Sequence, residues 1–88
     1  MTYEKLAYEN GVFYVMEVTQ VPNGQHTDYK CRGYARCNGI DLAEWVYWAL
    51  DEEEAYQEMT RDYLLRELRP MARHALEVLS KAYQLQTA

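Results

Sequence analysis

The sequence predicts an α+β fold. A three-stranded antiparallel β-meander, at about residues 3–8, 12–20 and 27–37, is expected to pack against two or three C-terminal helices, at about 42–50, 52–69 and 71–85. Three observations support this prediction: turn signals divide the first forty residues, charged and small residues alternate in the third segment, and the apolar period becomes helical after residue 41. With 88 residues and no linker or repeat, the chain is expected to form a single domain, residues 1–88.

Two turn signals separate the three expected strands. Asn10-Gly11 favours a tight hairpin turn, because both residues tolerate positive φ angles. The segment 21–24 marks the second turn, since its proline presets φ and its glycine accepts a positive value. The residues between these turns are rich in β-branched and aromatic side chains, which favours strands.

The third expected strand has two different faces. One face carries small residues, including Gly33 and Ala35, and suits a helix that lies close against the sheet. The other face is basic and contains one aromatic ring: Lys30, Arg32, Tyr34 and Arg36.

Helical spacing predicts the C-terminal half. The first expected helix has apolar residues at i, i+3, i+4 and i+7, namely Leu42, Trp45, Val46 and Ala49. Asp41 followed three residues later by Glu44 fits a capping box, and Asp51 with Glu54 repeats the arrangement, so a second helix is expected to start there. Pro70 either kinks this helix or opens a third one.

The net charge of −5 is concentrated in one region. Residues 1–40 are neutral, residues 41–58 carry seven acids and no base, and residues 59–88 carry +2. Such a region attracts basic surfaces and repels nucleic acid. Helix capping alone explains the four consecutive acids at 51–54, because carboxylates stabilise a helix N-terminus. A functional acidic surface is an equally good and compatible interpretation.

The leading hypothesis is a non-enzymatic protein-interaction module. It would be a small acidic inhibitor or regulator that docks on a basic protein surface, with mimicry of nucleic acid toward a nucleic-acid-binding complex as one version. Nine tyrosines and two tryptophans exceed what a small core readily encloses, so some rings are expected to contact the partner. The expected partner-binding residues are Asp41, Glu44, Trp48, Asp51, Glu52, Glu53, Glu54 and Glu58.

Two alternatives remain open. A small nucleic-acid-binding regulator would use the basic strand face, Lys30, Arg32, Tyr34 and Arg36, to bind phosphates and stack on a base. The isoelectric point of 4.9 makes direct nucleic-acid binding the weaker hypothesis. In the other alternative, the chain is a homo-oligomeric structural subunit, a homodimer for example, that buries its aromatic residues.

Catalysis, cofactors, metals and membranes are not expected. The sequence contains no glycine-rich phosphate loop and no nucleophile elbow. Cys31 and Cys37 are separated by five residues, whereas structural zinc sites usually pair ligands two to four apart on a turn. On one strand the two thiols would lie about 20 Å apart, which also argues against a disulfide. No apolar run is long enough to span a bilayer and no signal peptide is visible, so a cytoplasmic location is expected.

In its size, its acidity and its lack of catalytic motifs, the chain resembles the small inhibitors that phages encode against host defences, anti-CRISPR proteins among them. The resemblance is to a loose class without a shared motif, so it assigns no role to any residue. It implies an inhibitor that acts by binding a host protein.

Overall fold

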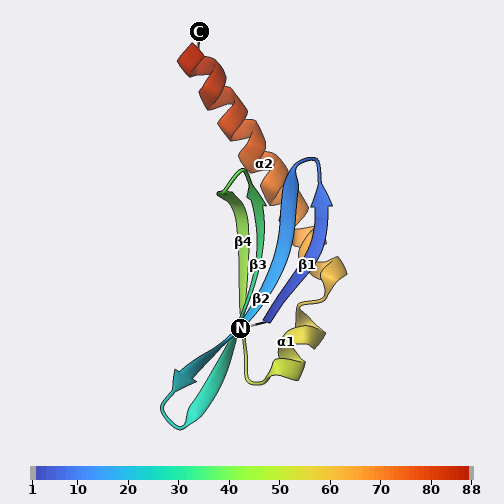
Figure 1. Ribbon diagram of the computed structural model, residues 1–88, viewed down its shortest axis with the longest axis vertical. Helices are drawn as coiled ribbons and strands as arrows, with labels where there is room; N and C mark the ends of the chain where they lie inside the picture. The colour runs from blue at the N-terminus through green and yellow to red at the C-terminus, as the bar shows by residue number, and fades with distance from the viewer. Residues whose placement is uncertain (1, 88) are drawn as a thin grey trace.

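The computed structural model describes the backbone of residues 2–87 and the side chains of residues 2–83, and it shows four strands followed by two helices (Figure 1). The strands are β1 (Thr2–Glu9), β2 (Val12–Asn23), β3 (His26–Cys37) and β4 (Ile40–Ala49). The helices are α1 (Glu52–Glu58) and α2 (Arg61–Thr87). Each strand pairs antiparallel with the next, in the order β1-β2-β3-β4. The predicted α+β class, with an antiparallel sheet and a C-terminal helix, is therefore confirmed.

Asn-Gly turns form two of the three hairpins. Asn10 and Gly11 have φ angles of 53° and 79°, and Asn38 and Gly39 have 50° and 78°. Two successive positive φ angles give a turn whose twist matches that of the flanking strands. The first of these hairpins was predicted. The second joins β3 to β4, so the meander continues for one strand more than predicted.

The prediction of a helix at about 42–50 is wrong, because this segment is strand β4. It pairs with β3 from Ile40 opposite Cys37 to Ala49 opposite Tyr29, with one irregularity near Leu42. Its run of aromatic and β-branched side chains favours a strand. Once the turn at 38–39 sends the chain back along β3, pairing with that strand also satisfies the backbone donors and acceptors.

The two later helices also differ from the prediction. The break lies at residues 59–60, where the side chain of Thr60 accepts a hydrogen bond from the Tyr63 backbone N–H at 3.3 Å. Helix α2 then runs through Pro70 without ending. Because proline has no backbone N–H, the Arg66 carbonyl oxygen is left without a helical donor. Pro70 is exposed, so this carbonyl lies on the side of the helix that faces water. Two helices, 52–58 and 61–87, thus replace the predicted 52–69 and 71–85.

The helices cover one face of the sheet and leave the other open. Met16, Cys31, Leu64 and Leu68 are fully buried between the sheet and the helices. A Cβ atom added at Gly33 would lie 2.6 Å from Cδ2 of Leu64. The small face predicted for the third strand therefore does receive a closely packed helix.

Two arginines of α2 attach the helix to β1. The Arg69 guanidinium donates to both carboxylate oxygens of Glu9, at 2.9 and 2.7 Å. Nε of Arg61 donates to the Leu6 carbonyl oxygen at 2.8 Å. The guanidinium beside Glu9 lowers the pKa of that carboxyl group below its ordinary value of 4.5.

Beyond Ala72, α2 leaves the sheet and projects from one end of the molecule, while the β2–β3 hairpin projects from the other (Figure 1). The molecule is consequently elongated, 57 × 26 × 16 Å. No helix within the described residues has the length and apolar character that a membrane span requires.

Candidate functional site

The predicted acidic surface is divided between two faces of the sheet. Asp41 and Glu44 lie on the open face of β4, opposite the basic positions of β3. Asp41 accepts hydrogen bonds from Arg36 at 2.7 Å and from Arg32 at 2.9 Å, and Glu44 pairs with Nε of Arg32. The hydrogen bond from Arg36, with a second from Arg32, lowers the pKa of Asp41 below its ordinary value. These two carboxylates are therefore neutralised within the chain.

The remaining acids gather around α1, on the helix side of the sheet. Asp51 is the N-cap, since its Oδ1 accepts from the Glu54 backbone N–H at 2.8 Å. Glu54 accepts from the Tyr47 hydroxyl and from the Leu50 backbone N–H, both at 2.9 Å. The hydrogen bond to Glu54 raises the pKa of Tyr47. Glu54 thus ties α1 to β4 and has a structural role.

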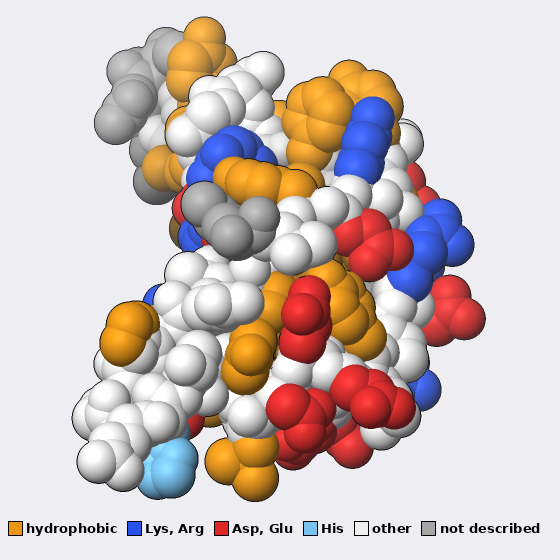
Figure 2. All heavy atoms as spheres, turned by 60° about the horizontal axis from the view of Figure 1, so that its bottom comes forward, with side chains coloured by type: hydrophobic (Ala, Val, Ile, Leu, Met, Phe, Trp, Pro, Cys, Tyr) orange, Lys and Arg blue, Asp and Glu red, His pale blue; other side chains and the backbone are white. Residues whose placement is uncertain are grey.

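The exposed carboxylates Asp51, Glu52, Glu53 and Glu58 form what we call the acidic end, the region of α1 and its N-cap. Neither they nor Glu54 form an ion pair with any side chain that the structure describes. Figure 2 shows acidic side chains gathered on this side of the molecule, next to hydrophobic ones. Among the neighbouring apolar residues, Leu50 is 81% exposed. A negative surface with an apolar neighbour is suited to contact a positively charged protein.

Trp48 does not join the acidic end. Its neighbours Tyr47 and Ala49 face the helices, so Trp48 points to the open face of the sheet. There it is 54% exposed, and the Lys30 ammonium lies 5.9 Å from the centre of its ring. The structure therefore separates Trp48 from the α1 carboxylates with which it was predicted to act.

The basic strand face is assembled as predicted, but its charges are engaged. The guanidinium carbons of Arg32 and Arg36 lie 4.3 and 4.8 Å from the centre of the Tyr34 ring, and Tyr34 is only 2% exposed. Burial, with a hydrogen bond to Tyr3, raises the pKa of Tyr34 to about 12. Arg32 also lies 3.7 Å from Glu17. A ring covered by two arginines does not offer a free face to a nucleic-acid base.

Sequence reasoning missed the aromatic residues at the edges of the open face. Tyr8 and Phe13 are opposite each other in the β1–β2 register, and their ring centres are 4.4 Å apart. They are 57% and 44% exposed, and Tyr3 on the same face is 60% exposed. The Lys5 ammonium lies above both rings of the pair, at 5.8 and 5.3 Å. The Asn10-Gly11 turn already indicated the register that brings Tyr8 and Phe13 together.

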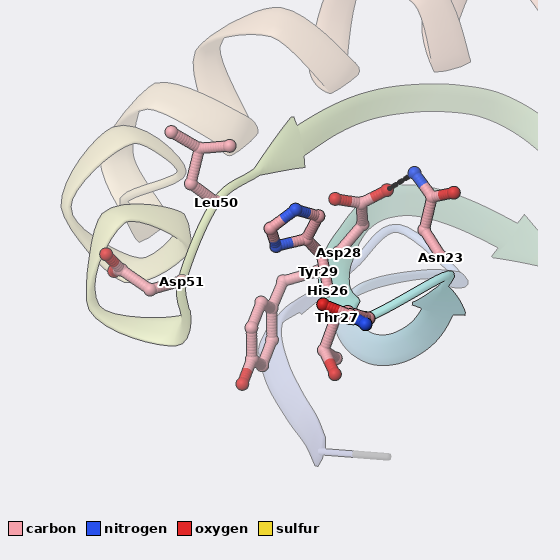
Figure 3. A pocket seen from close by; sticks show the side chains of 8 residues that line it. Asn23, His26, Thr27, Asp28, Tyr29, Leu50 and Asp51 are labelled. Atoms are coloured by element: carbon pink, nitrogen blue, oxygen red, sulfur yellow. Dashed lines mark hydrogen bonds between the residues drawn. The ribbon is translucent and has the colours of Figure 1, made fainter.

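A hollow of about 540 Å³ lies between the projecting β2–β3 hairpin and the start of α1 (Figure 3). Its carboxylates already have partners: Asp28 accepts from the Asn23 side chain at 3.0 Å, and Asp51 caps α1. No group of three or more potential metal ligands occurs within the described part of the chain. The hollow is therefore lined mainly by polar side chains, whose two carboxylates are already hydrogen-bonded within the chain.

A smaller hollow, of about 270 Å³, follows the outer side of β4. Its lining combines aromatic, aliphatic and acidic side chains from β4 and from the junction between the helices: Trp45, Val46, Tyr47, Glu58, Met59 and Tyr63. Trp45 and Tyr63 meet edge to face, with ring centres 6.3 Å apart. Glu58, which belongs to the acidic end, thus stands beside an aromatic recess.

No protein-family model matches the chain, and no curated protein or solved structure matches it either. The fold and surfaces define a small α+β protein with one covered and one open sheet face.

Proposed function

We propose that the protein is a non-enzymatic interaction module, a small acidic inhibitor or regulator that docks on a basic protein surface through its acidic end. The observation that carries the proposal is the difference between the two sets of acids. Asp41 and Glu44 are neutralised by β3, whereas the carboxylates of the acidic end have no cationic partner among the described side chains. Unpaired charges concentrated in one part of a molecule attract an oppositely charged surface over long range.

Docking would combine steering with an apolar contact. The carboxylates accelerate the encounter, while burial of Leu50 against the partner slows dissociation. Helix capping accounts for Asp51 and tethering of α1 for Glu54, so the residues left for partner binding are Glu52, Glu53 and Glu58. Mimicry of nucleic acid, a cytoplasmic location and an anti-defence role of the phage type belong to this proposal as its more specific versions.

The test compares two double charge reversals. Glu52→Lys/Glu58→Lys alters the acidic end, and Glu4→Lys/Glu67→Lys changes the net charge equally but elsewhere. Each tagged variant is used to capture partners from bacterial lysate, with and without nuclease, and the kinetics of the main partner are then measured against salt. We expect the first variant to lose about tenfold or more in association rate at low salt, and the control to lose much less.

Two outcomes would reject this proposal. Equal recovery of the partner by both variants would show that the acidic end is not the docking surface. Recovery of nucleic acid that nuclease abolishes would favour the alternative in which Lys30, Arg32, Tyr34 and Arg36 bind phosphates. Circular dichroism of each variant checks that α1 still forms.

A homo-oligomeric subunit is the second candidate, and one observation favours it. Past Ala72 the apolar stripe of α2 continues without a sheet beneath it, and Leu76, Val78 and Leu79 are 36%, 51% and 45% exposed. The projecting part of α2 covers only residues 73–87. An isolated helix of that length is only marginally stable in water, so contact with a second copy would stabilise it. A mass that increases with protein concentration, and that Leu79→Asp returns to the monomer value, would support this candidate.

A further inference from the structure

The two edges of the sheet differ in how they are protected. On β1, the strand is interrupted by a bulge at Leu6, whose carbonyl accepts a hydrogen bond from Arg61, and Lys5 lies beside it. Bulges, lysines and covering side chains are the usual means by which proteins prevent an edge strand from pairing with another chain. The β1 edge is thus closed to further strands.

The β4 edge has no bulge and no lysine along Ala43–Ala49. From Ala43 to Ala49 it pairs regularly with β3, and this stretch contains no lysine, arginine or proline. It consists largely of aromatic and β-branched residues, and among the described residues β4 is the last strand in the sheet order, with no strand on its outer side. Such an edge has backbone N–H and C=O groups available for an added strand.

We propose that β4 binds an extended, basic segment of the partner protein, which adds a fifth antiparallel or parallel strand to the sheet. The inference rests on the proposed function and specifies how the partner is bound. Main-chain hydrogen bonds to β4 would supply affinity, and the side chains of the added strand would alternate between the two faces.

Charge decides which occupant fits this edge. A second copy of the chain would bring a second set of the five acids of residues 51–58, none of which forms an ion pair with a described side chain, toward the same edge. Like charges across such a contact oppose pairing, so β4 is not expected to pair with itself. A segment that carries lysine or arginine has the complementary charge.

The recess beside β4 indicates where the cationic side chains of the added strand would lie. On the helix side, an added strand would direct alternate side chains toward Trp45, Tyr47 and Glu58. A lysine or arginine side chain, with its aliphatic stem and cationic head, suits this combination of aromatic rings and one carboxylate. The chain itself provides an example, since the Arg66 guanidinium lies 5.5 Å from the centre of the Tyr63 ring. On the open face, Val46 and Trp48 would contact uncharged, β-branched residues.

The experiment uses a synthetic peptide in which arginine alternates with threonine, of the same length as β4. Two control peptides have the same sequence but are N-methylated at the odd or at the even residues, which removes the backbone donors of one edge or of the other and keeps the charge. Binding to the full chain is followed by NMR, together with hydrogen exchange of the β4 amides. We expect alternate β4 amides to become protected, N-methylation on one edge of the peptide to weaken binding by about tenfold, and Glu58→Gln to weaken it more than Glu67→Gln.

Equal affinity of the plain peptide and of both methylated peptides, or unchanged exchange of the β4 amides, would overturn the inference. The captured partner separates the two proposals. If Glu52→Lys/Glu58→Lys abolishes its binding while the partner leaves the β4 amides unprotected, the acidic end docks the partner and strand addition is refuted. If the β4 amides are protected but the charge reversal has no effect, the proposed role of the acidic end is refuted instead.

Discussion

The close packing of Leu64 against Gly33 can be tested by replacing Gly33 with alanine. The new Cβ would lie 2.6 Å from Cδ2 of Leu64, whereas carbon atoms in contact are separated by about 3.5–4.0 Å. Leu64 must therefore move by about 1 Å, in a core where it is fully buried. Gly33 does not have a positive φ, so alanine introduces no backbone strain.

The expected magnitude follows from two opposing effects. Overpacking of a core costs about 1–3 kcal/mol. Replacing glycine by alanine within a strand recovers about 0.5–1 kcal/mol of chain entropy. We expect Gly33→Ala to lower the free energy of unfolding by about 1 kcal/mol, as measured by urea denaturation followed through tryptophan fluorescence at fixed protein concentration.

A double-mutant cycle isolates the contact. Leu64→Ala alone should cost about 2–5 kcal/mol, because it leaves a cavity. In that background the Cβ of Gly33→Ala enters the vacated space, so the second substitution should become neutral or stabilising. We expect a coupling energy of at least about 1 kcal/mol. Additivity within about 0.5 kcal/mol would show that Leu64 does not press on Gly33 and would refute the packing described above.

Three further predictions concern the cap of α1, the acid stability and the thiols. Asp51→Ala should lower the free energy of unfolding by about 0.5–2 kcal/mol, through loss of the N-cap, in the same urea assay. Because Arg69 lowers the pKa of folded Glu9, the stability from this pair is present above the ordinary carboxyl pKa of 4.5 and is lost as the pH falls; Glu9→Gln should flatten this part of the pH–stability curve. Cys31 is fully buried, and burial raises its pKa to about 11, so Ellman's reagent should label Cys37 at pH 8 and reach Cys31 only on unfolding.

Local turn chemistry and alternation were sufficient to predict that the first three segments are strands. The second turn was misplaced, because residues 21–23 still pair with β3 and the chain turns at residues 24–25. Asn10-Gly11 indicated the first hairpin, and the alternation along residues 27–37 indicated both faces of β3, including the small face at Gly33. These signals are local: each depends on residues that are adjacent or two positions apart.

The identity of β4 required information that its own periodicity does not contain. A helical spacing fits the apolar residues Leu42, Trp45, Val46 and Ala49. The same segment also has apolar residues at every second position, 43, 45, 47 and 49, which is the spacing of one face of a strand. Short apolar segments often satisfy both patterns, and pairing with a neighbouring strand then decides between them. The informative signal was Asn38-Gly39, which repeats the dipeptide of the first hairpin.

The candidate site was predictable in composition but not in arrangement. As long as residues 42–50 are expected to form a helix, all the acids of 41–58 lie on adjoining helices. As a strand, this segment places Asp41 and Glu44 beside Arg32 and Arg36, and the acidic end on the other side of the sheet. Which carboxylates are neutralised therefore depends on the cross-strand register of β3 and β4, which no local pattern specifies.

The same ion pairs bear on both competing functional hypotheses. Arg32 and Arg36 are engaged by the carboxylates of β4 and cover Tyr34, which weakens the basic strand face as a site for nucleic acid. The contacts also neutralise Asp41 and Glu44, so the unpaired charge of the acidic region is confined to α1 and its cap. That charge lies beside the β4 edge, where the recess contains Glu58. A partner attracted by the acidic end would thus be brought alongside the one sheet edge that has no lysine, arginine or proline over residues 43–49, and steering and strand addition would act at the same place.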